Sequence, residues 1–355
     1  MKKKVKKLTF ILIIGLFVAI LAACGGNENT QKTASNSNEK NESSNSGNEL
    51  EEVKARLAHT YPIEEPVSKG VQKFSELVAE KSGGKIEITI FPSGQLYDDK
   101  SMPEALSTGQ IEMGMNTVEM WSGQIPAAEF TILPLFSDFD QVHNALDNGI
   151  SDIFVEELNK FGVQPLIWSD FGFAYFASKE EPLVSPEDFE GKRVRVTSPL
   201  LAKYVELAGG SPVTMGGAEV DQALQRGTID AALSGITAFV KMQYFQYTDY
   251  YSGPQNVGLV TTSANLDWWN GLSDEAKEII TEAAAEAQLW TSEEVEKQVE
   301  MDVETLSSEG MEMVETNKED FKEIREQIIQ EYLKRSGDTG EKIIDIITKS
   351  TQESQ

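Results

Sequence analysis

Two arginines alternate along a short stretch rich in β-branched residues, from Lys192 to Thr197. Because side chains alternate between the two faces of a strand, Arg193 and Arg195 would share one face of a strand here. A guanidinium donates two parallel hydrogen bonds to a carboxylate, a geometry that lysine cannot copy. The stretch therefore supplies a candidate carboxylate-binding group, and two solvated arginines on a strand edge remain the alternative.

Groups that could carry out catalysis are few. The only histidines are His59, which we expect to pack at a strand end, and His143, and neither lies in a nucleophile or zinc-protease motif. Adjacent carboxylates such as Asp98 and Asp99 cannot point at one substrate, so they indicate solvated charge. No loop has the spacing of a calcium site, and Cys24 is the only cysteine. We therefore expect a binding protein without enzyme activity, cofactor or metal.

The charge balance excludes one class of partner. The chain has 31 basic and 58 acidic residues, and removal of five lysines with an N-terminal signal would leave 26 against 58, a net charge of −32. A protein this acidic repels the phosphates of nucleic acid. An anionic ligand must therefore be captured by a local positive site, which makes each arginine of a pocket important.

The N-terminal residues have the pattern of a lipoprotein signal. Lysines precede an apolar run, Leu8 to Ile20, and a lipobox, Leu21 to Cys24, follows. A membrane-spanning helix needs about 20 apolar residues, and residues 8–23 are too few. We expect residues 1–23 to be a signal peptide and Cys24 to be lipidated, which would hold the protein outside the cytoplasm on the outer face of the cell membrane. Residues 24–50, which are polar, are predicted to form a disordered tether.

From Leu50 onward the period of the apolar pattern switches repeatedly between helix and strand. Helices are predicted at about 67–78, 103–106, 199–207 and 218–225, and strands at 86–91, 111–115, 192–197 and 228–233. This alternation predicts an α/β fold with mostly parallel sheets, whose ligand sites lie beyond the carboxyl ends of the strands.

The C-terminal part of the chain is helical in pattern. A run that begins at Asp274 has few breaks before Gly310, which predicts one long helix that spans two lobes. A kink in that helix, or two helices joined without a visible turn, remains open. A further helix is predicted at 321–332, and residues 348–355 are expected to form a frayed tail.

Five sequence blocks occur in an order and spacing typical of one family. They are FPSGQL at 91–96, GQIEMG at 109–114, LPLF at 133–136, GKRVRV at 191–196 and EVDQALQRGTID at 219–230. Together they resemble the solute receptors of tripartite ATP-independent periplasmic (TRAP) transporters, the dicarboxylate-binding-protein (DctP) family. The match covers almost everything from Val53 to the C-terminal helices, and the last two blocks are the most specific.

The resemblance implies a two-lobed, periplasmic-binding-protein-like α/β fold with hinge strands. Lobe I would contain residues 51–171 plus about 258–295, and lobe II residues 172–257 plus about 296–347. Such a receptor closes on a small organic acid and delivers it to the small and large integral-membrane subunits of a transporter driven by an ion gradient. A receptor of an ATP-driven importer and a ligand-presenting co-receptor of a sensor kinase would share the fold and the anchor, and both remain alternatives.

The resemblance also implies individual site residues. Arg195 matches the arginine that grips the ligand carboxylate in the family. Thr60 and Asn116 follow strands at positions that contact ligand in the family, although either could simply form a turn, and Thr117 is a weaker candidate. Ser234 stands where many members have an asparagine, and its hydroxyl offers fewer donors and a shorter reach.

Two further positions depart from the family pattern. Tyr175 stands where many members have a second arginine, and alternation would put it on one face with Phe171 and Phe173, as in a packed core. Gly217 stands where some sugar-acid binders have an aromatic ring, so the pocket would be larger there unless this is a turn glycine.

These departures bear on the ligand. One arginine and more aromatic surface predict one firmly held carboxylate and a less charged remainder, such as a 2-oxo, hydroxy, aromatic or branched acid. A C4-dicarboxylate would lack an evident partner for its second carboxylate. Candidates for an apolar wall are Trp121, Trp168, Phe239 and Tyr244.

Overall fold

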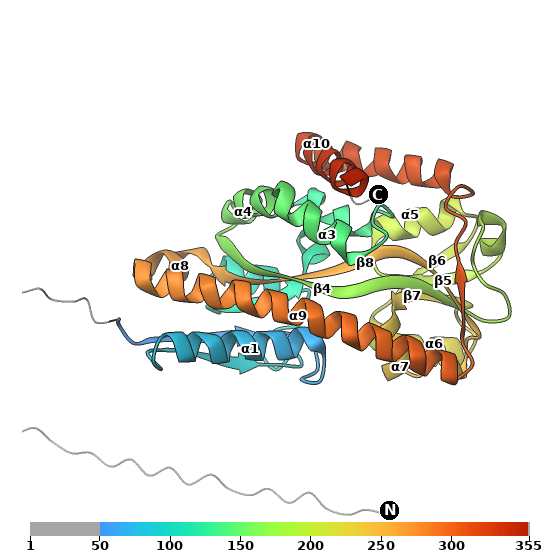
Figure 1. Cartoon of the computed structure of the whole chain (residues 1–355). Coiled ribbons are helices and arrows are strands. Elements are labelled where there is room, and N and C mark those ends of the chain that lie inside the picture. The colour runs from blue at the N-terminus through green and yellow to red at the C-terminus, as the bar shows by residue number, and fades with distance from the viewer. Residues whose placement is uncertain (1–49, 354–355) are drawn as a thin grey trace, which may run out of the picture. The chain divides into compact units, whose positions relative to one another are not determined.

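The computed structural model of the chain describes residues 50–353 (Figure 1), so that Cys24 and the predicted signal and tether lie outside the described residues. The strands are β1 (Val53–Ala58), β2 (Ile86–Phe91), β3 (Met113–Thr117), β4 (Val163–Ser178), β5 (Arg193–Val196), β6 (Ser211–Thr214), β7 (Ala231–Gly235), β8 (Tyr250–Asn265) and β9 (Glu312–Glu315). The α-helices are α1 (Pro66–Lys81), α2 (Met102–Ser107), α3 (Phe139–Ala145), α4 (Ser151–Asn159), α5 (Pro199–Leu207), α6 (Val220–Gln225), α7 (Ile236–Lys241), α8 (Leu266–Gly271), α9 (Asp274–Ser308) and α10 (Lys322–Glu353).

Short helical turns connect these elements. They are η1 (Val118–Trp121), η2 (Pro126–Ile132), η3 (Leu146–Ile150), η4 (Pro186–Phe189), η5 (Gly217–Glu219) and η6 (Tyr244–Gln246). Several predicted elements are confirmed almost to the residue, including β2 and α5. Their local signals are strong, because Ser198 caps α5 by accepting a hydrogen bond from the backbone of Leu201, and Pro199 occupies the first helical position.

Within the described residues, nine strands form one sheet in the order β2-β1-β3-β8-β4-β7-β5-β6, with β9 paired to β8. Five of the eight strand pairings are parallel, and each of the three antiparallel pairings includes β4 or β8. The predicted α/β class with mostly parallel pairing is therefore confirmed. The parallel strands fall into two groups, β1 to β3 on one side and β5 to β7 on the other.

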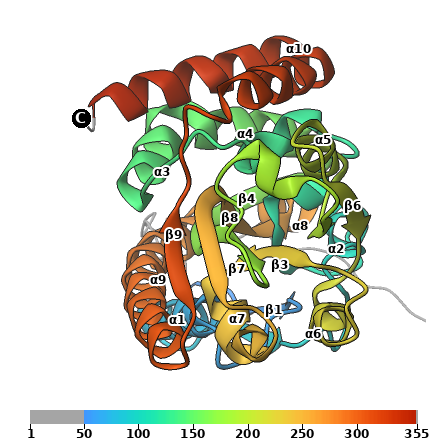
Figure 2. The same ribbon diagram turned by 90° about the vertical axis from the view of Figure 1, so that its right-hand side faces the viewer.

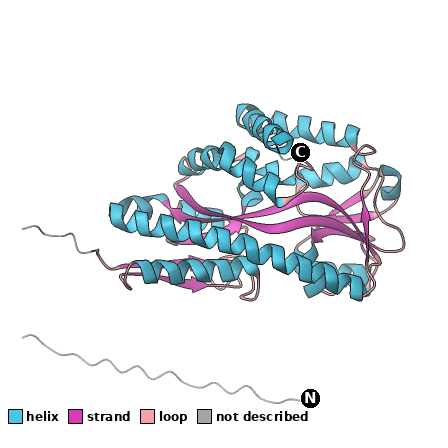
Figure 3. Ribbon diagram, viewed as in Figure 1, coloured by secondary structure: helices cyan, strands magenta, loops and turns pink. Residues whose placement is uncertain are grey.

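Two long strands join these groups. β4 and β8 each have 16 residues and pair with one another along most of their length (Figure 3). Register shifts interrupt the β4–β8 ladder at three places, one of them between Asp170 and Gly172. Such bulges bend and twist a strand pair, which suits strands that connect two halves of a protein. The exact bounds of the two lobes stay a prediction.

Helix α9 is a single helix of 35 residues, so the alternatives of a kink or of two joined helices are wrong. Its first turn is capped by Ser273, which accepts a hydrogen bond from the backbone of Ala276. α9 packs on α1, β4 and α7, and thus runs beside both strand groups (Figures 1 and 2). α1 and α9 approach closely at Gly70, where an added Cβ would lie 2.0 Å from Oγ1 of Thr291.

Helix α10 is longer than predicted. It covers α3, α5 and η2 and continues to Glu353, with a non-helical residue at Gly337. Residues 348–353, expected to fray, are helical because Ile343 and Ile347 are buried in the core and Ser350 is buried beside them. The sequence pattern underestimated the length of this helix, because Gly337 and Gly340 interrupt the helical pattern of the sequence.

Candidate ligand-binding site

Arg195 lies near the carboxyl end of β5 with its side chain inside the protein, only 5% exposed. Nε donates to the carbonyl oxygen of Met215 at 3.2 Å, and Nη1 donates to that of Leu233 at 2.7 Å. Burial lowers the pKa of Arg195, and the nearby Tyr244 and Glu119 raise it. No carboxylate of the described residues forms an ion pair with this guanidinium, so a buried cation is held by neutral groups alone.

Arg193 differs from Arg195 although it is two residues away on the same strand. It is 45% exposed, pairs with Asp230 at 2.8 Å, and donates to the carbonyl oxygen of Gly227 at 2.7 Å. Arg193 therefore has a structural partner on the surface, and the alternative of a solvated arginine applies to Arg193 but not to Arg195. The two arginines share a strand but only Arg195 lacks an anionic partner.

Three hydroxyl-bearing residues lie on the same side of the molecule as Arg195. Ser234 directly follows Leu233, whose carbonyl oxygen accepts a hydrogen bond from Arg195. Ser234 is paired across the sheet with Tyr175 of β4. Tyr244 is buried in η6; burial raises its pKa to about 12, although Arg195 and a hydrogen bond with Ser234 act in the opposite direction. The ring of Tyr175 packs edge-on against Tyr251 at 5.7 Å, and burial raises its pKa to about 12. Two of the predicted residues, Ser234 and Tyr175, are thus neighbours.

A second network lies at the carboxyl ends of β1 and β3. The backbone N–H of Thr117 donates to Oδ1 of Asp99 at 3.0 Å, and its hydroxyl donates to Oδ2 at 2.6 Å. Tyr61, which follows β1, shares a hydrogen bond with the Thr117 hydroxyl at 3.0 Å. Burial, with a contribution from the charge of Asp98, raises the pKa of Asp99, although the two hydrogen bonds from Thr117 lower it. Thr117, a weak candidate from the sequence, is central to this network.

Glu119 extends from η1, directly after β3, and is half-buried. Burial, reinforced by the charge of Asp99, raises the pKa of Glu119 to about 7, while Arg195 lowers it. Arg195 and Glu119 thus act on each other electrostatically, and yet they form no ion pair. The first strand group thus carries an acid, and the second a cation, neither of which has an ion-pair partner among the described residues.

The remaining predicted residues are less closely connected. Asn116 is fully buried, donates from Nδ2 to the carbonyl oxygen of Thr117 at 2.9 Å, and has an Oδ1 without a hydrogen-bond partner among the described residues. Thr60 is half-buried just after β1. Gly217 is exposed at the start of η5, with open space where a side chain would be. His59 packs as expected, since it is fully buried and its pKa falls to about 4.

Two interpretations from the sequence require correction. Asp98 is exposed, but Asp99 is half-buried and bound to Thr117, so this carboxylate pair is more than solvated charge. Tyr61, Asp99 and Glu119 were not among the residues predicted for the site. The signal that could have found Tyr61 and Glu119 is their position just beyond β1 and β3.

The second correction concerns the aromatic residues of β4. Phe171 is 39% exposed and its ring contacts Tyr61 at 5.4 Å, whereas Phe173 is buried against Phe139 at 5.1 Å. They do not form one packed face with Tyr175. The register shifts of β4 on either side of Phe173 break the simple alternation from which that face was predicted.

Comparison with known proteins identifies the family. The model of family 7 of the bacterial extracellular solute-binding proteins, DctP, matches residues 57–337. The chain belongs to this family. Its members are substrate-binding receptors and not enzymes, which confirms the function class expected from the sequence.

Relatives of this receptor have been named for several ligands. The C4-dicarboxylate-binding periplasmic protein of Rhodobacter capsulatus is 26% identical over 297 residues, which cover 81% of this chain and 88% of the relative. The ectoine-binding periplasmic protein of Halomonas elongata is 26% identical over 286 residues, covering 77% and 83%. The solved structure of a TRAP periplasmic solute-binding protein from Roseobacter denitrificans with bound β-D-glucuronate matches with a TM-score of 0.77 at 28% identity, covering 83% and 98%.

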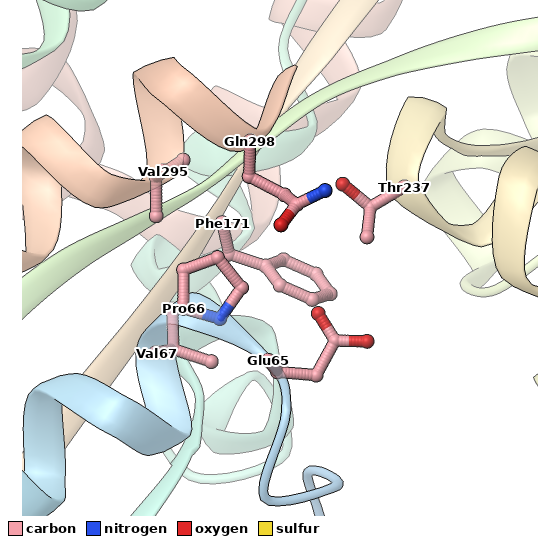
Figure 4. Close-up of a pocket in the computed structure, with 7 residues that line it drawn as sticks. All are labelled: Glu65, Pro66, Val67, Phe171, Thr237, Val295 and Gln298. Atoms are coloured by element: carbon pink, nitrogen blue, oxygen red, sulfur yellow. The ribbon is translucent and has the colours of Figure 1, made fainter. Parts of the chain in front are cut away.

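The receptor also has a small cavity next to the site described above. Side chains from the start of α1, from β4, α7 and α9 converge on it (Figure 4): Glu65, Pro66, Val67, Phe171, Thr237, Val295 and Gln298. Beside the cavity, Glu65 forms an ion pair with Lys241 of α7 at 2.5 Å. This pair connects the helix that follows β1 with the helix that follows β7, and so joins the two strand groups directly.

A serine, a histidine and an aspartate from α9, α3 and β4 meet in a cluster, which we call the crossing. They do not form a catalytic relay. Nε2 of His143 contacts the carboxylate of Asp170 and also the hydroxyl of Ser292, at 3.2 Å from the latter. The Ser292 hydroxyl itself donates to Asp170 at 3.0 Å. A relay would use the two ring nitrogens separately, whereas here one nitrogen makes both contacts. This cluster joins α3, β4 and α9 and has a structural role.

Two features are absent from residues 50–353. No helix in this range is both long and apolar enough to cross a membrane. No group of three or more metal-ligating side chains in this range could hold a metal ion. The relatives are periplasmic or extracytoplasmic binding proteins.

Proposed function

We propose that this receptor captures a small organic acid between its two lobes and that Arg195 grips the ligand carboxylate. The observation that carries the proposal is a buried guanidinium without an anionic partner among the described residues. Two hydrogen bonds to backbone carbonyls fix its orientation before ligand arrives. Charge-assisted hydrogen bonds from such a group are worth roughly 1.5 to 3 kcal/mol each.

The other predicted residues would complete the pocket. Ser234 and Tyr175 are neighbours on the arginine side, Thr117 and Asn116 lie at the end of β3, and Thr60 follows β1. These five would supply hydroxyl and amide groups to the part of the ligand beyond the carboxylate. Gly217 would leave room for a larger ligand, since space is open at its Cα.

We further propose that the receptor delivers the acid to the small and large membrane subunits of a TRAP transporter. The names of similar proteins of known structure, which are TRAP periplasmic solute-binding proteins, support delivery to such a transporter. Lipidation at Cys24 would keep the receptor at the outer face of the membrane, with residues 24–50 as a tether. Service to an ATP-driven importer or to a sensor kinase is the alternative, and a neighbouring pair of genes for a small and a large membrane subunit would decide for a TRAP system.

A ligand screen tests the carboxylate site. The body that begins near Leu50 is heated with a library of organic acids, sugars and peptides, and a ligand at 100 times its Kd should stabilise the protein by about 2.7 kcal/mol. Arg195→Ala should abolish that stabilisation, and Arg193→Ala, the matched control on the same strand, should preserve it. Stabilisation by sugars or peptides alone would overturn the proposal, as would an Arg195→Ala protein that still binds the acid.

The anchor has its own test. The full chain and a Cys24→Ser variant are produced in a bacterium that processes lipoproteins, and the mature N-terminus is analysed by mass spectrometry. We expect a diacylglyceryl group on Cys24 of the native chain and detergent-phase partition that the variant loses. A native chain without lipid at Cys24 would refute the anchor and leave the ligand proposal intact.

A further inference from the structure

The two sides of the proposed site carry opposite charges. Arg195 is on the side formed by β5 and β7, and Asp99 and Glu119 are on the side formed by the ends of β2 and β3. The charges of Arg195 and Glu119 influence one another across the site, but the two side chains are too far apart for an ion pair. The space between them therefore separates a cation from an anion.

Neither acid has a cationic partner among residues 50–353. Asp99 is held by the N–H and hydroxyl of Thr117, which are neutral donors, and no described lysine or arginine forms an ion pair with Glu119. Elsewhere in these residues, two of the three buried carboxylates have a basic partner: Glu129 pairs with Arg335, and Asp170 with His143, whereas Asp302 accepts from the amide of Gln298. The acids of the site thus resemble Arg195 in lacking the counterion that Glu129 and Asp170 have.

The charge balance of the bound state discriminates between ligand classes. A dicarboxylate could satisfy Arg195 with one group but would bring its second anion toward Asp99 and Glu119, where like charges repel at short range. A neutral tail would leave Glu119 without a partner in a site from which water is excluded on closure. A ligand with one carboxylate and one cationic nitrogen compensates the charges on both sides.

We infer that the ligand of this receptor is a small zwitterion, whose carboxylate binds Arg195 and whose protonated nitrogen donates to Glu119. This rests on the proposed function, since it assumes that Arg195 holds a carboxylate. Asp99 supports the nitrogen from a second direction while Thr117 fixes its position. Glu119 is then the residue that selects amino or imino acids over acids without a nitrogen.

Matched pairs of probes test the inference. Each pair has one carbon skeleton with and without a basic nitrogen: L-proline and cyclopentanecarboxylate, L-alanine and propionate, 4-aminobutanoate and butanoate, and succinate is added as a dicarboxylate. We expect one or more of the nitrogen-containing probes to raise the melting temperature and its partner to do so far less. Succinate or a nitrogen-free acid that binds as tightly as the matched zwitterions would overturn the inference.

Variants assign the selection to Glu119. Glu119→Gln keeps the shape of the side chain but removes its charge. It should therefore weaken binding of the zwitterion that stabilises the native protein by roughly 10- to 100-fold. Glu104→Gln, an exposed carboxylate on the neighbouring α2, is the matched control and should change nothing. Arg195→Ala should remove binding of every acid. Unchanged affinity in Glu119→Gln, with binding still dependent on Arg195, refutes the inference and leaves the proposed function standing.

Proton release gives an independent measurement. The groups that face Glu119 are Asp99, Arg195, Glu129 and Tyr61, and its pKa of about 7 leaves it roughly half protonated at pH 7. A cationic nitrogen would lower that pKa, so calorimetry in buffers of different ionisation enthalpy should show release of up to about half a proton at pH 7. Proton uptake would indicate an anion beside Glu119 and overturn the inference. If no acid of the panel shifts the melting temperature, the proposed function itself fails, and the inference with it.

Discussion

The site around Arg195 and the crossing at Asp170 both bury a charged group, but only the crossing supplies its counterion. Arg195 is 5% exposed and donates to two carbonyl oxygens, whereas Asp170, 2% exposed, contacts His143 and Ser292. A buried charge with a partner ties secondary-structure elements together, while one without a partner can be compensated by a ligand. The two groups differ in their internal counterion and not in their degree of burial, and the proposed role of Arg195 rests on that difference.

The largest effect should come from removing the charge of the site while keeping its volume. Arg195→Met should weaken ligand binding by about 100-fold or more, because two charge-assisted hydrogen bonds are lost. The free energy of unfolding without ligand should stay the same or rise, since an apolar side chain replaces an uncompensated buried charge. Urea unfolding and calorimetric titration would measure both quantities. A large loss of stability without ligand would break the comparison.

The opposite result is expected at the crossing. Asp170→Asn should lower the free energy of unfolding by about 1 to 3 kcal/mol, because contacts of a buried carboxylate with His143 and Ser292 are weakened. Ligand affinity should remain within about two-fold, as Asp170 has its partners inside the protein. A variant with native stability but weakened binding would show that the crossing belongs to the ligand site.

The pH dependence of stability sharpens the same contrast. The hydrogen bond with Asp170 raises the pKa of His143 above its usual value, against the effect of burial. This contribution to stability is therefore complete below about pH 6.5 and is lost as the pH rises through the raised pKa. Melting temperatures between pH 5.5 and pH 9 should fall with rising pH more steeply in the native protein than in His143→Gln. Parallel curves for the two proteins would exclude this role for His143.

The smallest effect is expected at the ion pair between the two strand groups. Lys241→Ala should change the free energy of unfolding by only about 0.5 kcal/mol, because the pair with Glu65 is partly exposed. It should nevertheless speed ligand release, since Glu65 and Lys241 link helices on opposite sides of the site. Stopped-flow release of a bound acid would measure this, with Lys203→Ala, an exposed lysine of α5, as control. Equal release rates would limit the pair to a surface role.

Much of the fold was predictable because its signals are local. The apolar period of α1, the serine cap and proline of α5 and the alternation in β2 depend on residues close in sequence. β4 and β8 were harder, since their pairing joins residues far apart and contains register shifts that break alternation. For the same reason, Phe171 and Phe173 were placed on one face, and the bulge separates them.

The site was predictable only in part. The family pattern selected Arg195, Ser234 and Thr117 among its candidates, and the rule that ligands bind beyond strand ends pointed to the carboxyl ends of β5, β7 and β3. Asp99 was missed because it is adjacent to the exposed Asp98, and the sequence does not say which of two neighbouring carboxylates turns inward. Glu119 was missed although it lies just beyond β3, since the sequence does not show which carboxylate lacks a counterion.

The sequence by itself determined the family, the alternation of helix and strand, the long helix α9 and the arginine most suited to hold a carboxylate. Only the tertiary structure decided which charges have partners: among the described residues it pairs Arg193 with Asp230 and His143 with Asp170, and it leaves Arg195 without an ion pair. The physical reason is that helix and strand patterns are set by neighbours along the chain. Electrostatic compensation depends instead on distances in space between residues that are many positions apart.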